Sequence, residues 1–409
     1  MNYVIVGNGV AGISAAEAIR QLDLNGRLTI IAAETFPPYC RPMISLLLEG
    51  AVTPEKLSIR PPSFYEQLQI QPILGDQVVR IDVPNRILHT RQGRTVDFDR
   101  LLIATGADPN PIPAMKPEMK NVFFMRTEVQ VRQMLDVLPQ VRQALVLGGG
   151  LVGFKAAYAL LHRGMPVTML IRSDYPLAMQ VDDQAGKMIL KELVGHGLEV
   201  KVGVDVTGFD GADKVTRAHL SDGTDLPCDL VIVGKGVSPA LTFVPRDQIQ
   251  VNQGILVDDY LETTAAGIFA AGDVAEARDI TRGTCRINAI WPEAVDQGRL
   301  AGMNMAGRRV AYRGSLGRNV IRIFDLDVMT GGLVHPPAEP AYEVHSALDL
   351  RRRTYRKLVF HQDRLVGIIM VNAIDQGGIL LSLIRSRMPL AIPREQMLSP
   401  IFNYRTLLR

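Results

Sequence analysis

The sequence predicts an α/β fold with two Rossmann-like dinucleotide-binding domains and a C-terminal α+β domain. The apolar run YVIV leads into the turn GNGVAG, an Ala-rich helix and a second apolar strand, RLTIIAAE. The same order returns about 140 residues later in QALVLGGGLVGFKAAYALLHRGMPVTMLIRS. Uninterrupted apolar strands are typical of buried parallel sheets, and a glycine turn between strand and helix is typical of a nucleotide-binding βαβ unit. From about residue 312 the strands alternate or run apolar with short turns between them, which indicates an antiparallel sheet.

The domain boundaries follow from chain length and from two Pro/Gly-rich stretches. A chain of 409 residues is too long for one core. The stretches NPIPAMKP and GKGVSPA are the natural crossings between domains. We therefore expect one dinucleotide-binding domain made of residues 1–109 and 237–311, a second at 110–236, and the α+β domain at 312–409.

Two segments predict local elements outside the βαβ units. The segment DQVVRIDVPNRILHTRQGRTVDFDRLLIATG predicts two hairpin strands with a turn at RQGR, followed by an apolar strand. In the C-terminal domain, VFHQDRLVG predicts a hairpin and DQGGILLSLIRSR a helix.

Composition excludes several classes of protein. The net charge of +3 implies no general attraction to nucleic acid. No apolar run approaches the roughly 18 residues of a membrane helix, and the N-terminus lacks the pattern of a signal peptide, so we expect a cytoplasmic protein without a membrane partner. Three scattered cysteines and seven histidines without ligand spacing predict neither a disulfide framework nor a metal site.

The first glycine turn has the features of a dinucleotide site. Gly7, Gly9 and Gly12 form G-x-G-x-x-G between a strand and a helix. The first glycine permits the tight turn, the second lets a pyrophosphate approach the backbone, and the third lets helix and strand pack closely. The helix N-terminus then meets the diphosphate charge. Glu34 ends the second strand, where a carboxylate can accept hydrogen bonds from ribose hydroxyls.

The second glycine turn has the same spacing at Gly148, Gly150 and Gly153, but its second strand ends differently. Ile171 occupies the position where an acid would favour NAD, and Arg172 follows at once. Because a guanidinium binds phosphate bidentately and a carboxylate would repel it, the strand end favours NADP(H) over NAD(H). The alternative is a solvated Arg172 with NAD(H) as the cofactor.

A third motif, IFAAGDVAE at 268–276, places Asp273 after an apolar strand and a glycine. With the first glycine turn, it makes the chain resemble the FAD-dependent pyridine nucleotide–disulfide oxidoreductase superfamily. Within it, the chain is most similar to NAD(P)H:rubredoxin or ferredoxin reductases and to the flavin modules of nitrite reductase large subunits. The resemblance covers roughly residues 1–310, and the rest more weakly. It is carried by Glu34 and by GNGVAG, PPYCRPMIS, LLIATG, GGGLVG, GILVDDYLETTAAGIFAAGDVAE and WPEAVDQGRLAGMNMAG.

The resemblance implies an FAD site in the first domain and an NAD(P) site in the second. Glu34 would bind the adenosine ribose, Val78 the adenine through its backbone, and Asp273 a ribityl hydroxyl. The start of the helix in WPEAVDQG would direct its amides at the flavin pyrimidine oxygen. The implied FAD-binding residues are Gly7, Gly9, Gly12, Glu34, Arg41, Val78, Ala104, Thr105, Gly106, Gly272, Asp273, Trp291 and Glu293. Those implied for NAD(P) are Gly148, Gly150, Gly153, Arg172 and Gly236.

Two of these FAD residues have an alternative interpretation. Trp291 would lie against the flavin ring, or it is a core tryptophan at a domain seam. Arg41 would be a cation at the FAD phosphates or the flavin edge, or it is a solvated loop arginine.

The chain departs from the family pattern at two positions. Relatives with RPPLSK have a lysine where Leu46 stands, and they commonly have a glutamate where Lys155 stands. Both members of a usual Lys–Glu pair are therefore altered. The departure puts fast hydride transfer and NADH preference in question, and Lys155 is a candidate for replacing the missing cation.

Cys40 lies in the loop where some members of the family carry a redox-active sulfur. It has no second cysteine at short spacing, and Arg41 and Pro42 follow it, as in the electron-transferring relatives. Single-cysteine relatives carry SFxxCG there. We therefore expect Cys40 not to be catalytic, and Cys228 and Cys285 to be packing residues.

These observations predict an FAD-dependent NAD(P)H oxidoreductase that passes electrons from the nicotinamide through the flavin to a small acidic protein of the rubredoxin or ferredoxin type. One alternative is an NADH oxidase, peroxidase or coenzyme A disulfide reductase that uses Cys40. Another is a flavin-binding subunit or sensor with little turnover of its own. The basic stretch RRRTYRK at 351–357 is either a docking site for an acidic partner or a solvated strand face. A homodimer is a further possibility.

Overall fold

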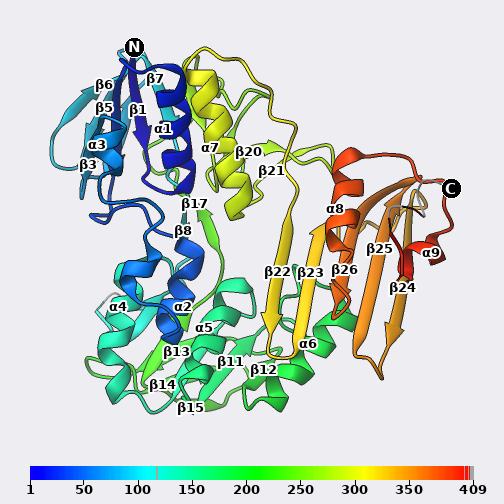
Figure 1. Ribbon diagram of the computed structural model, residues 1–409. Coiled ribbons are helices and arrows are strands. Elements are labelled where there is room, and N and C mark those ends of the chain that lie inside the picture. Colours follow the sequence, from blue (N-terminus) through cyan, green and yellow to red (C-terminus); the bar gives the residue numbers. More distant parts are fainter. Residues whose placement is uncertain (117, 400, 404, 406–409) are drawn as a thin grey trace. The chain divides into compact units, whose positions relative to one another are not determined.

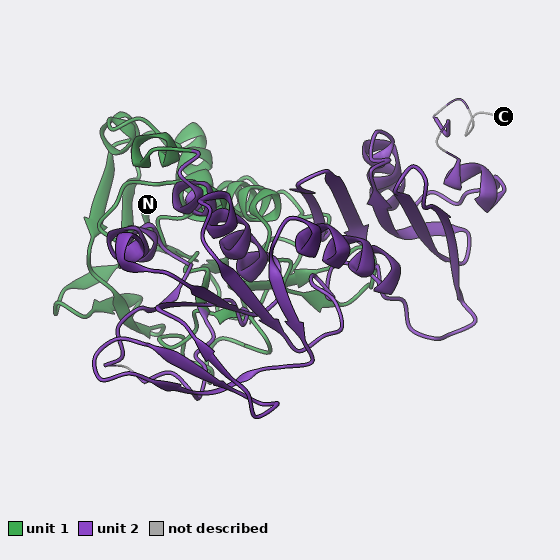
Figure 2. Ribbon diagram, turned by 90° about the horizontal axis from the view of Figure 1, so that it is seen from below, with its two compact units in different colours: residues 1–43, 52–108, 237–315 green, residues 44–51, 109–236, 316–409 purple. Residues whose placement is uncertain are grey.

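The computed structural model describes residues 1–116, 118–399, 401–403 and 405. The chain divides into two compact units (Figure 2). Unit 1 contains Met1–Met43, Val52–Asp108 and Val237–Ser315. Unit 2 contains Ile44–Ala51, Pro109–Gly236 and Leu316–Arg409. Because 316–409 groups with 109–236, the division of the chain into three domains stays a proposal.

Unit 1 is built on a five-stranded parallel sheet with the order β19-β7-β1-β2-β3 (Figure 1). Its strands are β1 (Asn2–Val6), β2 (Arg27–Ala32), β3 (Ile70–Leu74), β7 (Arg100–Ile103) and β19 (Ile268–Ala270). Val6 in the middle strand pairs with Ile31 on one side and Ile103 on the other. All five residues of β1 are buried, as the apolar run predicts.

Three smaller sheets complete unit 1. The sequence predicts two hairpin strands before β7, but there are three antiparallel strands, because a turn at 83–86 precedes the predicted turn at RQGR. These strands are β4 (Val78–Asp82), β5 (Ile87–Thr90) and β6 (Thr95–Asp97). A second sheet contains β18 (Ile255–Leu256), β20 (Ala275–Arg278) and β21 (Cys285–Arg286). The crossing segments pair as β8 (Ala107–Pro109) and β17 (Val237–Pro239).

Helices α1 (Val10–Leu22) and α7 (Trp291–Met305) pack side by side in unit 1 (Figure 1). A Cβ on Gly298 would lie 2.1 Å from the Ala11 oxygen, and one on Gly302 would lie 2.4 Å from the Ala15 oxygen. Because both contacts advance together along the two helices, α1 and α7 run parallel. Ala11 lies near the start of α1, whereas Gly298 lies further into α7. At 1.5 Å per residue, the N-terminus of α7 therefore extends about 9 Å beyond the N-terminus of α1. The unit also contains α3 (Phe64–Gln67) and 3₁₀ turns at Arg41–Met43 and Pro54–Leu57.

Unit 2 contains a second five-stranded parallel sheet, with the order β12-β11-β10-β16-β9. Its strands are β9 (Val122–Phe124), β10 (Ala144–Leu147), β11 (Val167–Ile171), β12 (Glu199–Val202) and β16 (Leu230–Val233). The helices of this part are α2 (Ile44–Glu49), α4 (Glu128–Val137), α5 (Leu151–His162) and α6 (Asp183–Gly195), with a 3₁₀ turn at Leu138–Gln140. An antiparallel sheet adds β13 (Val206–Asp210), β14 (Arg217–Leu220) and β15 (Asp225–Pro227).

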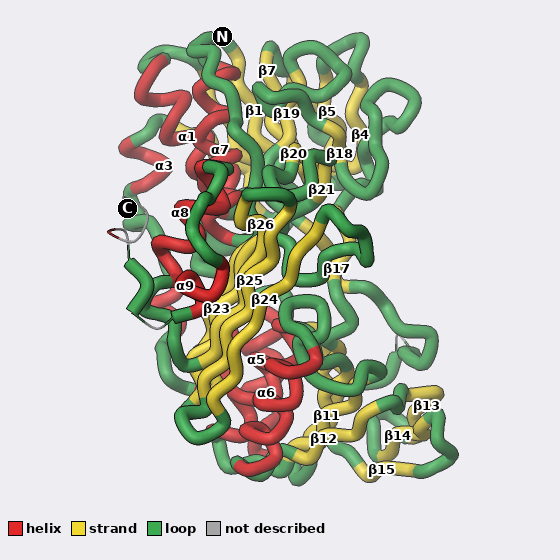
Figure 3. Tube along the Cα trace, turned by 90° about the vertical axis from the view of Figure 1, so that its right-hand side faces the viewer, coloured by secondary structure: helices red, strands yellow, loops and turns green. Residues whose placement is uncertain are grey.

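The C-terminal part of unit 2 is a five-stranded antiparallel sheet, with the order β22-β23-β26-β25-β24 (Figure 3). Its strands are β22 (Arg318–Ile323), β23 (Leu326–Gly332), β24 (Tyr342–Asp349), β25 (Thr354–His361) and β26 (Arg364–Val371). The predicted hairpin VFHQDRLVG is the β25–β26 turn, and the predicted helix is α8 (Gly377–Ser386). A short α9 (Arg394–Leu398) follows. The predicted fold class, two Rossmann-like sheets and an α+β part, is confirmed.

Among the described residues, no helix is both long enough and apolar enough to cross a membrane.

Candidate functional site

The first glycine turn is shaped by close backbone contacts. Gly7 has φ +122°, and a Cβ there would lie 2.1 Å from the Ala104 oxygen. A Cβ on Gly12 would lie 2.0 Å from the Gly7 oxygen. At Gly9, the N-cap of α1, a Cβ would meet nothing within 4 Å. The turn therefore needs glycine at its two ends, while its middle leaves space in front of a helix N-terminus, where an anion binds favourably.

An unsatisfied buried acceptor lies beside that space. Asn8 Nδ2 donates to the Phe36 oxygen at 3.2 Å and to Tyr65 Oη at 2.8 Å. Among the described residues, Asn8 Oδ1 is one of few buried side-chain oxygens without a hydrogen-bond partner. Buried polar atoms are normally satisfied. An acceptor left over next to an open helix N-terminus fits a bound dinucleotide, which carries hydroxyl donors.

The predicted FAD residues gather at the carboxyl end of one parallel sheet. Gly7 follows β1, Glu34 follows β2, Ala104 follows β7 and Gly272 follows β19. In α/β sheets, ligands bind in the crevice at this edge. The sheet thus brings together residues that are far apart in the sequence.

Glu34 and Arg41, predicted to contact different parts of FAD, contact each other. Arg41 Nη2 donates to Glu34 Oε1 at 2.5 Å, and Tyr39 Oη donates to Glu34 Oε2 at 2.7 Å. Burial lowers the Arg41 pKa, but Tyr39, Glu34 and Asp273 together raise that pKa above its ordinary value. Arg41 is therefore a permanent cation close to two carboxylates of the predicted site, and the solvated-loop interpretation is wrong.

The other predicted FAD residues have mixed environments. Val78 begins β4 and is buried, and Ala104 is buried with its amide donating to the Val6 oxygen at 2.8 Å. Thr105 Oγ1 donates to the Ala240 oxygen at 3.1 Å, and Gly106 has φ +71°.

Around α7, Trp291 is the first helical residue and is half-buried, and Asp273 is half-buried after β19. Gly272, with φ +81°, donates its amide to Gln297 Oε1 at 2.8 Å. Glu293 is fully buried and accepts a hydrogen bond from Tyr312, a partner that the sequence did not indicate.

The second glycine turn repeats the geometry of the first. Gly148 has φ +104°, and a Cβ there would lie 2.4 Å from the Gly234 oxygen. A Cβ on Gly153 would lie 2.0 Å from the Gly148 oxygen, while one on Gly150, the N-cap of α5, would meet nothing within 4 Å. Gly236 has φ +85° and accepts a hydrogen bond from the Asn110 amide at 3.0 Å. Both turns thus leave a helix N-terminus open.

Charged residues that sequence analysis missed surround Arg172. Arg172 follows β11 and is exposed, with its Nε 3.4 Å from Asp205 Oδ2. Lys235 Nζ lies 2.7 Å from Asp205 Oδ1. Two cations and one carboxylate therefore meet at the end of the strand where the nucleotide is predicted to bind. Lys235 directly follows the apolar strand LVIVG, and this position could have predicted it as a site residue. No comparable pattern in the sequence predicts Asp205.

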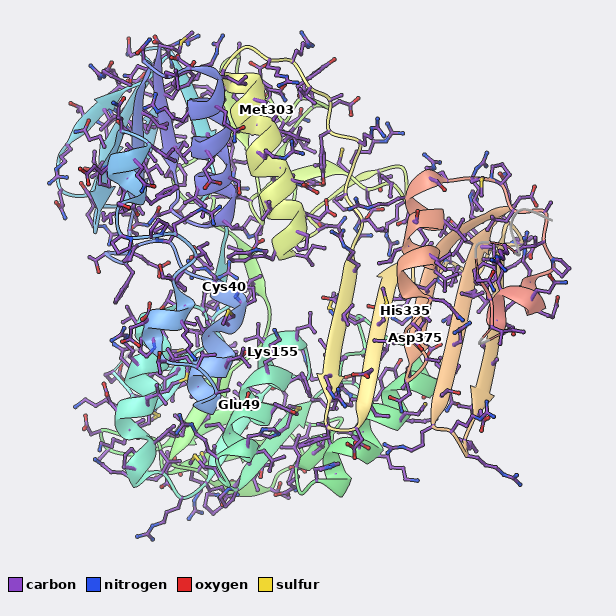
Figure 4. The ribbon with its side chains drawn as sticks, viewed as in Figure 1. Cys40, Glu49, Lys155, Met303, His335 and Asp375 are labelled. Carbon is purple, nitrogen blue, oxygen red and sulfur yellow. The ribbon has the colours of Figure 1, made fainter. Side chains whose placement is uncertain are left out.

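The two altered family positions lie on packed helices of unit 2. Lys155 is on α5 and half-buried (Figure 4), and Leu46 is on α2 and exposed. Helix α2 packs on α5. Glu49 Oε1 at the end of α2 lies 2.9 Å from His162 Nδ1 at the end of α5, and Arg163 donates to the Leu48 oxygen. A close Glu–His contact and a hydrogen bond therefore connect these two helices, although not at the position of the usual Lys–Glu pair.

All three cysteines are free thiols, in three different environments. Cys40 is half-buried, and its amide donates to the Leu57 oxygen at 2.8 Å. Cys228 is buried, and burial, with the nearby Asp229, raises its pKa to about 12, so it is a packing residue as predicted. Cys285 is exposed in β21, and the prediction that it packs in the core is wrong.

The basic stretch 351–357 is not a uniformly solvated face. Tyr355, Arg356 and Lys357, on the inner strand β25, are buried. Tyr355 Oη donates to Asp182 Oδ2 at 2.7 Å, and Lys357 Nζ lies 3.1 Å from the same atom. Arg356 donates to the Ser399 oxygen at 2.8 Å. Both interpretations of this stretch, docking site and solvated strand, are wrong for its second half, which fixes the sheet to its neighbours.

One group of described residues has the composition of a metal site: Glu192, His196 and Asp325. Glu192 Oε2 forms an ion pair with Arg353, and Glu192 Oε1 accepts the Asp325 amide at 2.9 Å. His196 Nδ1 lies 2.9 Å from the Glu192 main-chain oxygen. The Glu192 carboxylate already has protein partners, so we assign no metal to this group.

Comparison with known proteins gives two family matches. The model of the pyridine nucleotide-disulphide oxidoreductase family matches residues 1–298, and that of the rubredoxin NAD+ reductase C-terminal domain matches residues 318–388. The first match covers the two parallel sheets, and the second covers the C-terminal antiparallel sheet.

Several characterised proteins are similar along most of this chain. The epsilon subunit of the NADH-dependent phenylglyoxylate dehydrogenase of Aromatoleum evansii is 31% identical, with 97% of each chain covered. Two Bacillus subtilis proteins, the assimilatory nitrate reductase electron transfer subunit and the nitrite reductase [NAD(P)H], are 28% and 29% identical over 97% and 93% of this chain. This chain spans about half the length of those two relatives, 51% and 47%.

A solved structure shows the same fold over nearly the whole length. The ferredoxin reductase from Rhodopseudomonas palustris superposes with a TM-score of 0.89 at 26% identity, covering 98% of both chains. The family model covers well over half of this chain. The chain therefore belongs to the pyridine nucleotide-disulphide oxidoreductase family.

Proposed function

We propose that this protein binds FAD and NAD(P)H and passes electrons from the nicotinamide through the flavin to a small redox protein. The observation that carries the proposal is the presence of two open glycine turns, Gly7–Gly12 and Gly148–Gly153, each after the middle strand of its own parallel sheet. One nucleotide site would be enough for a simple dehydrogenase. Two sites are what a flavin enzyme that is reduced by a nicotinamide needs. When bound, the flavin supplies the exchange of an electron pair for single electrons.

In this proposal, the residues of unit 1 bind and orient the FAD. The N-terminus of α1 and the Arg41 cation neutralise the diphosphate, Glu34 holds the adenosine ribose and Asp273 a ribityl hydroxyl. Glu34 would have to exchange part of its contact with Arg41 and Tyr39 for the ribose. The α7 N-terminus stabilises negative charge on the pyrimidine side of the flavin.

We further propose NADPH as the preferred donor. The exposed Arg172 places a cation at the strand end where NAD-binding proteins carry an acid, and Lys235, after β16, contacts the same Asp205 as Arg172 does. Asp205 contacts both cations, and its negative charge weakens the preference for NADPH without reversing it. NADPH is therefore favoured over NADH, but NADH is not excluded as a donor.

The partner that fits unit 1 is a small acidic protein. The β20–β21 hairpin carries Arg278, Arg282 and Arg286, all exposed. Asp279, buried at its base, fixes the hairpin by accepting hydrogen bonds from the Thr281 amide at 2.8 Å and Asn288 Nδ2 at 2.9 Å. The hairpin connects Asp273 directly to the start of α7, so its cations lie on the segment between two predicted flavin contacts. An acidic rubredoxin or ferredoxin would be attracted to this surface.

A second candidate function is that of an electron-transfer subunit with little activity of its own. The names of two similar proteins, a dehydrogenase subunit epsilon and an electron transfer subunit, favour this candidate. The altered Leu46 and Lys155 positions favour it as well, because they remove the charge pair common in the family. A cytoplasmic location and a homodimer stay predictions of the sequence.

Replacing Cys40 by Ser tests electron transfer against thiol chemistry. Cys40 has no second cysteine close in the sequence, and catalysis by disulfide exchange needs a thiolate and a partner sulfur. We expect Cys40→Ser to reduce a rubredoxin or ferredoxin with NAD(P)H at the wild-type rate, measured by acceptor absorbance under argon. Cys285→Ser is the control for removing an exposed thiol. Loss of acceptor reduction in Cys40→Ser alone would favour the alternative oxidase or disulfide reductase.

A further inference from the structure

In unit 1, a buried tyrosine donates a hydrogen bond to a buried carboxylate in the first turn of α7. Glu293 is the third residue of the helix and 1% exposed, and Tyr312 is 7% exposed. Tyr312 Oη donates to Glu293 Oε2 at 2.6 Å. Glutamate is rarely fully buried unless it is paired, because a carboxylate loses its hydration on burial. A carboxylate retained at this cost in the first turn of a helix points to a role beyond packing.

The pair is connected to the turn that precedes Asp273. Gln297, one turn further along α7, donates from Nε2 to Tyr312 Oη at 3.3 Å. Its Oε1 accepts the Gly272 amide at 2.8 Å. Gln297 is itself buried. Tyr312, the first two turns of α7 and the turn after β19 therefore form one hydrogen-bonded network inside unit 1.

The position of α7 brings this network to the flavin half of the dinucleotide. Helices α1 and α7 run parallel, with Ala11 level with Gly298, so α7 begins about 9 Å ahead of α1. In the proposed FAD site the α1 N-terminus would face the diphosphate, and the α7 N-terminus would then lie nearer the flavin. Its partial positive charge favours an anionic reduced flavin, and a carboxylate in the first turn offsets that charge.

We propose that Tyr312 holds Glu293 as a buried negative charge in the first turn of α7, and that this charge lowers the reduction potential of the bound flavin. The inference rests on the proposed FAD site. Tyr312 remains a hydrogen-bond donor because burial, followed by the charge of Glu293, raises its pKa above the ordinary value. A lower potential makes the reduced flavin a stronger donor to a low-potential acceptor. Glu293 and Tyr312 are thus positioning residues for the electrostatics of the site.

The test is a spectroelectrochemical titration of the FAD-loaded protein. We expect Glu293→Gln, which keeps the shape and removes the charge, to raise the equilibrium constant for flavin reduction about tenfold, or about 30 mV for a two-electron couple. Tyr312→Phe should shift the potential in the same direction, because Phe no longer donates the hydrogen bond that fixes the Glu293 carboxylate in the first turn of α7. In the double variant, the reduction potential of the flavin should be no higher than in Glu293→Gln alone.

The matched control is a second tyrosine–carboxylate pair of the same unit. Tyr3 Oη donates to Asp23 Oδ2 at 3.0 Å, and Asp23 is the C-cap of α1, at the opposite end from the glycine turn. Asp23→Asn should leave the flavin potential unchanged. An unchanged potential in Glu293→Gln, or an equal rise in Asp23→Asn, would overturn the inference. So would loss of FAD from both Glu293→Gln and Tyr312→Phe with an unchanged melting temperature. A wild-type protein that binds no FAD would instead overturn the proposed function.

Discussion

At the residue scale, the two nucleotide sites have the same backbone and different charges. Glycines at the same spacing open both turns, and the close contacts at Gly7 and Gly148 are nearly identical in kind. Glu34 gives the first site an acid after its second strand, whereas Arg172 gives the second site a cation. On the proposed function, cofactor choice would depend on a few side chains at strand ends, and these can be tested one at a time.

Arg172→Gln tests the preference for NADPH. A charge-assisted hydrogen bond to the 2′-phosphate contributes roughly 1.5–3 kcal/mol, so its loss should raise the KM for NADPH about tenfold or more. The KM for NADH should stay the same, since NADH lacks that phosphate. Steady-state kinetics with both nucleotides give the two values.

Arg217→Gln is the control for Arg172→Gln. Arg217 is another exposed arginine of unit 2, and its Nη1 lies 3.4 Å from Asp225 Oδ2, the same separation as in the Arg172–Asp205 pair. The control should change neither KM. Equal increases for NADH and NADPH in Arg172→Gln would contradict a role in phosphate recognition.

Residues whose role follows from backbone geometry could be predicted from the sequence. The glycine spacing specified which positions must lack a Cβ, and the contacts at Gly12 and Gly153 agree with it. Residues whose role depends on a distant partner could not. Asp205 and Tyr312 act through partners brought close only by the fold, and Cys285 is exposed because it lies in a hairpin without a covering layer.

At the element scale, the β20–β21 hairpin is the surface of unit 1 that we propose to bind an acidic partner. The buried Asp279 accepts hydrogen bonds from the Thr281 amide and from Asn288, which fixes the backbone that carries the exposed arginines. Attraction between opposite charges acts mainly on the association rate and weakens with salt. The hairpin should therefore influence acceptor reduction, whereas reduction of the flavin by nucleotide should not depend on it.

Reversing the charge at Arg278 and Arg286 tests this surface. At low ionic strength we expect the double Arg→Glu variant to reduce an acidic ferredoxin about tenfold more slowly or worse, with a much weaker salt dependence than wild type. The measurement is the second-order rate of acceptor reduction over a salt series.

The control for charge reversal is Arg80→Glu with Arg91→Glu, since both arginines are exposed on the β4–β6 sheet of the same unit. This control changes the net charge equally. Equal slowing in both double variants would show that total charge, and not the hairpin, governs association.

The elements themselves were predictable to different degrees. The parallel strands have strong apolar runs, and all five residues of β1 and of β11 are buried. The third strand of the β4–β6 sheet was missed, because the turn at 83–86 contains no glycine and Arg86 adopts φ +54° there. The burial of β25 was missed because its basic side chains pair with Asp182 and with main-chain oxygens of segments that are distant in the sequence.

At the scale of the whole molecule, the chain joins two nucleotide-binding units through short crossings. The boundaries of the units fall at 108/109, 236/237 and 315/316, with 44–51 grouped in unit 2. Its 45 basic and 42 acidic residues nearly balance, so attraction of a partner has to come from local clusters of charge. The joint presence of both sites in one chain is the basis of the proposed activity.

The most direct test of that activity is anaerobic rapid mixing of the FAD-loaded protein with NADPH and, separately, with NADH, following the flavin absorbance near 450 nm. The account predicts that NADPH bleaches the flavin fully and that NADH does so more slowly. It also predicts that an added acidic ferredoxin or rubredoxin restores the absorbance. If neither nucleotide bleaches the flavin, the account of this chain as a nicotinamide-driven reductase is contradicted.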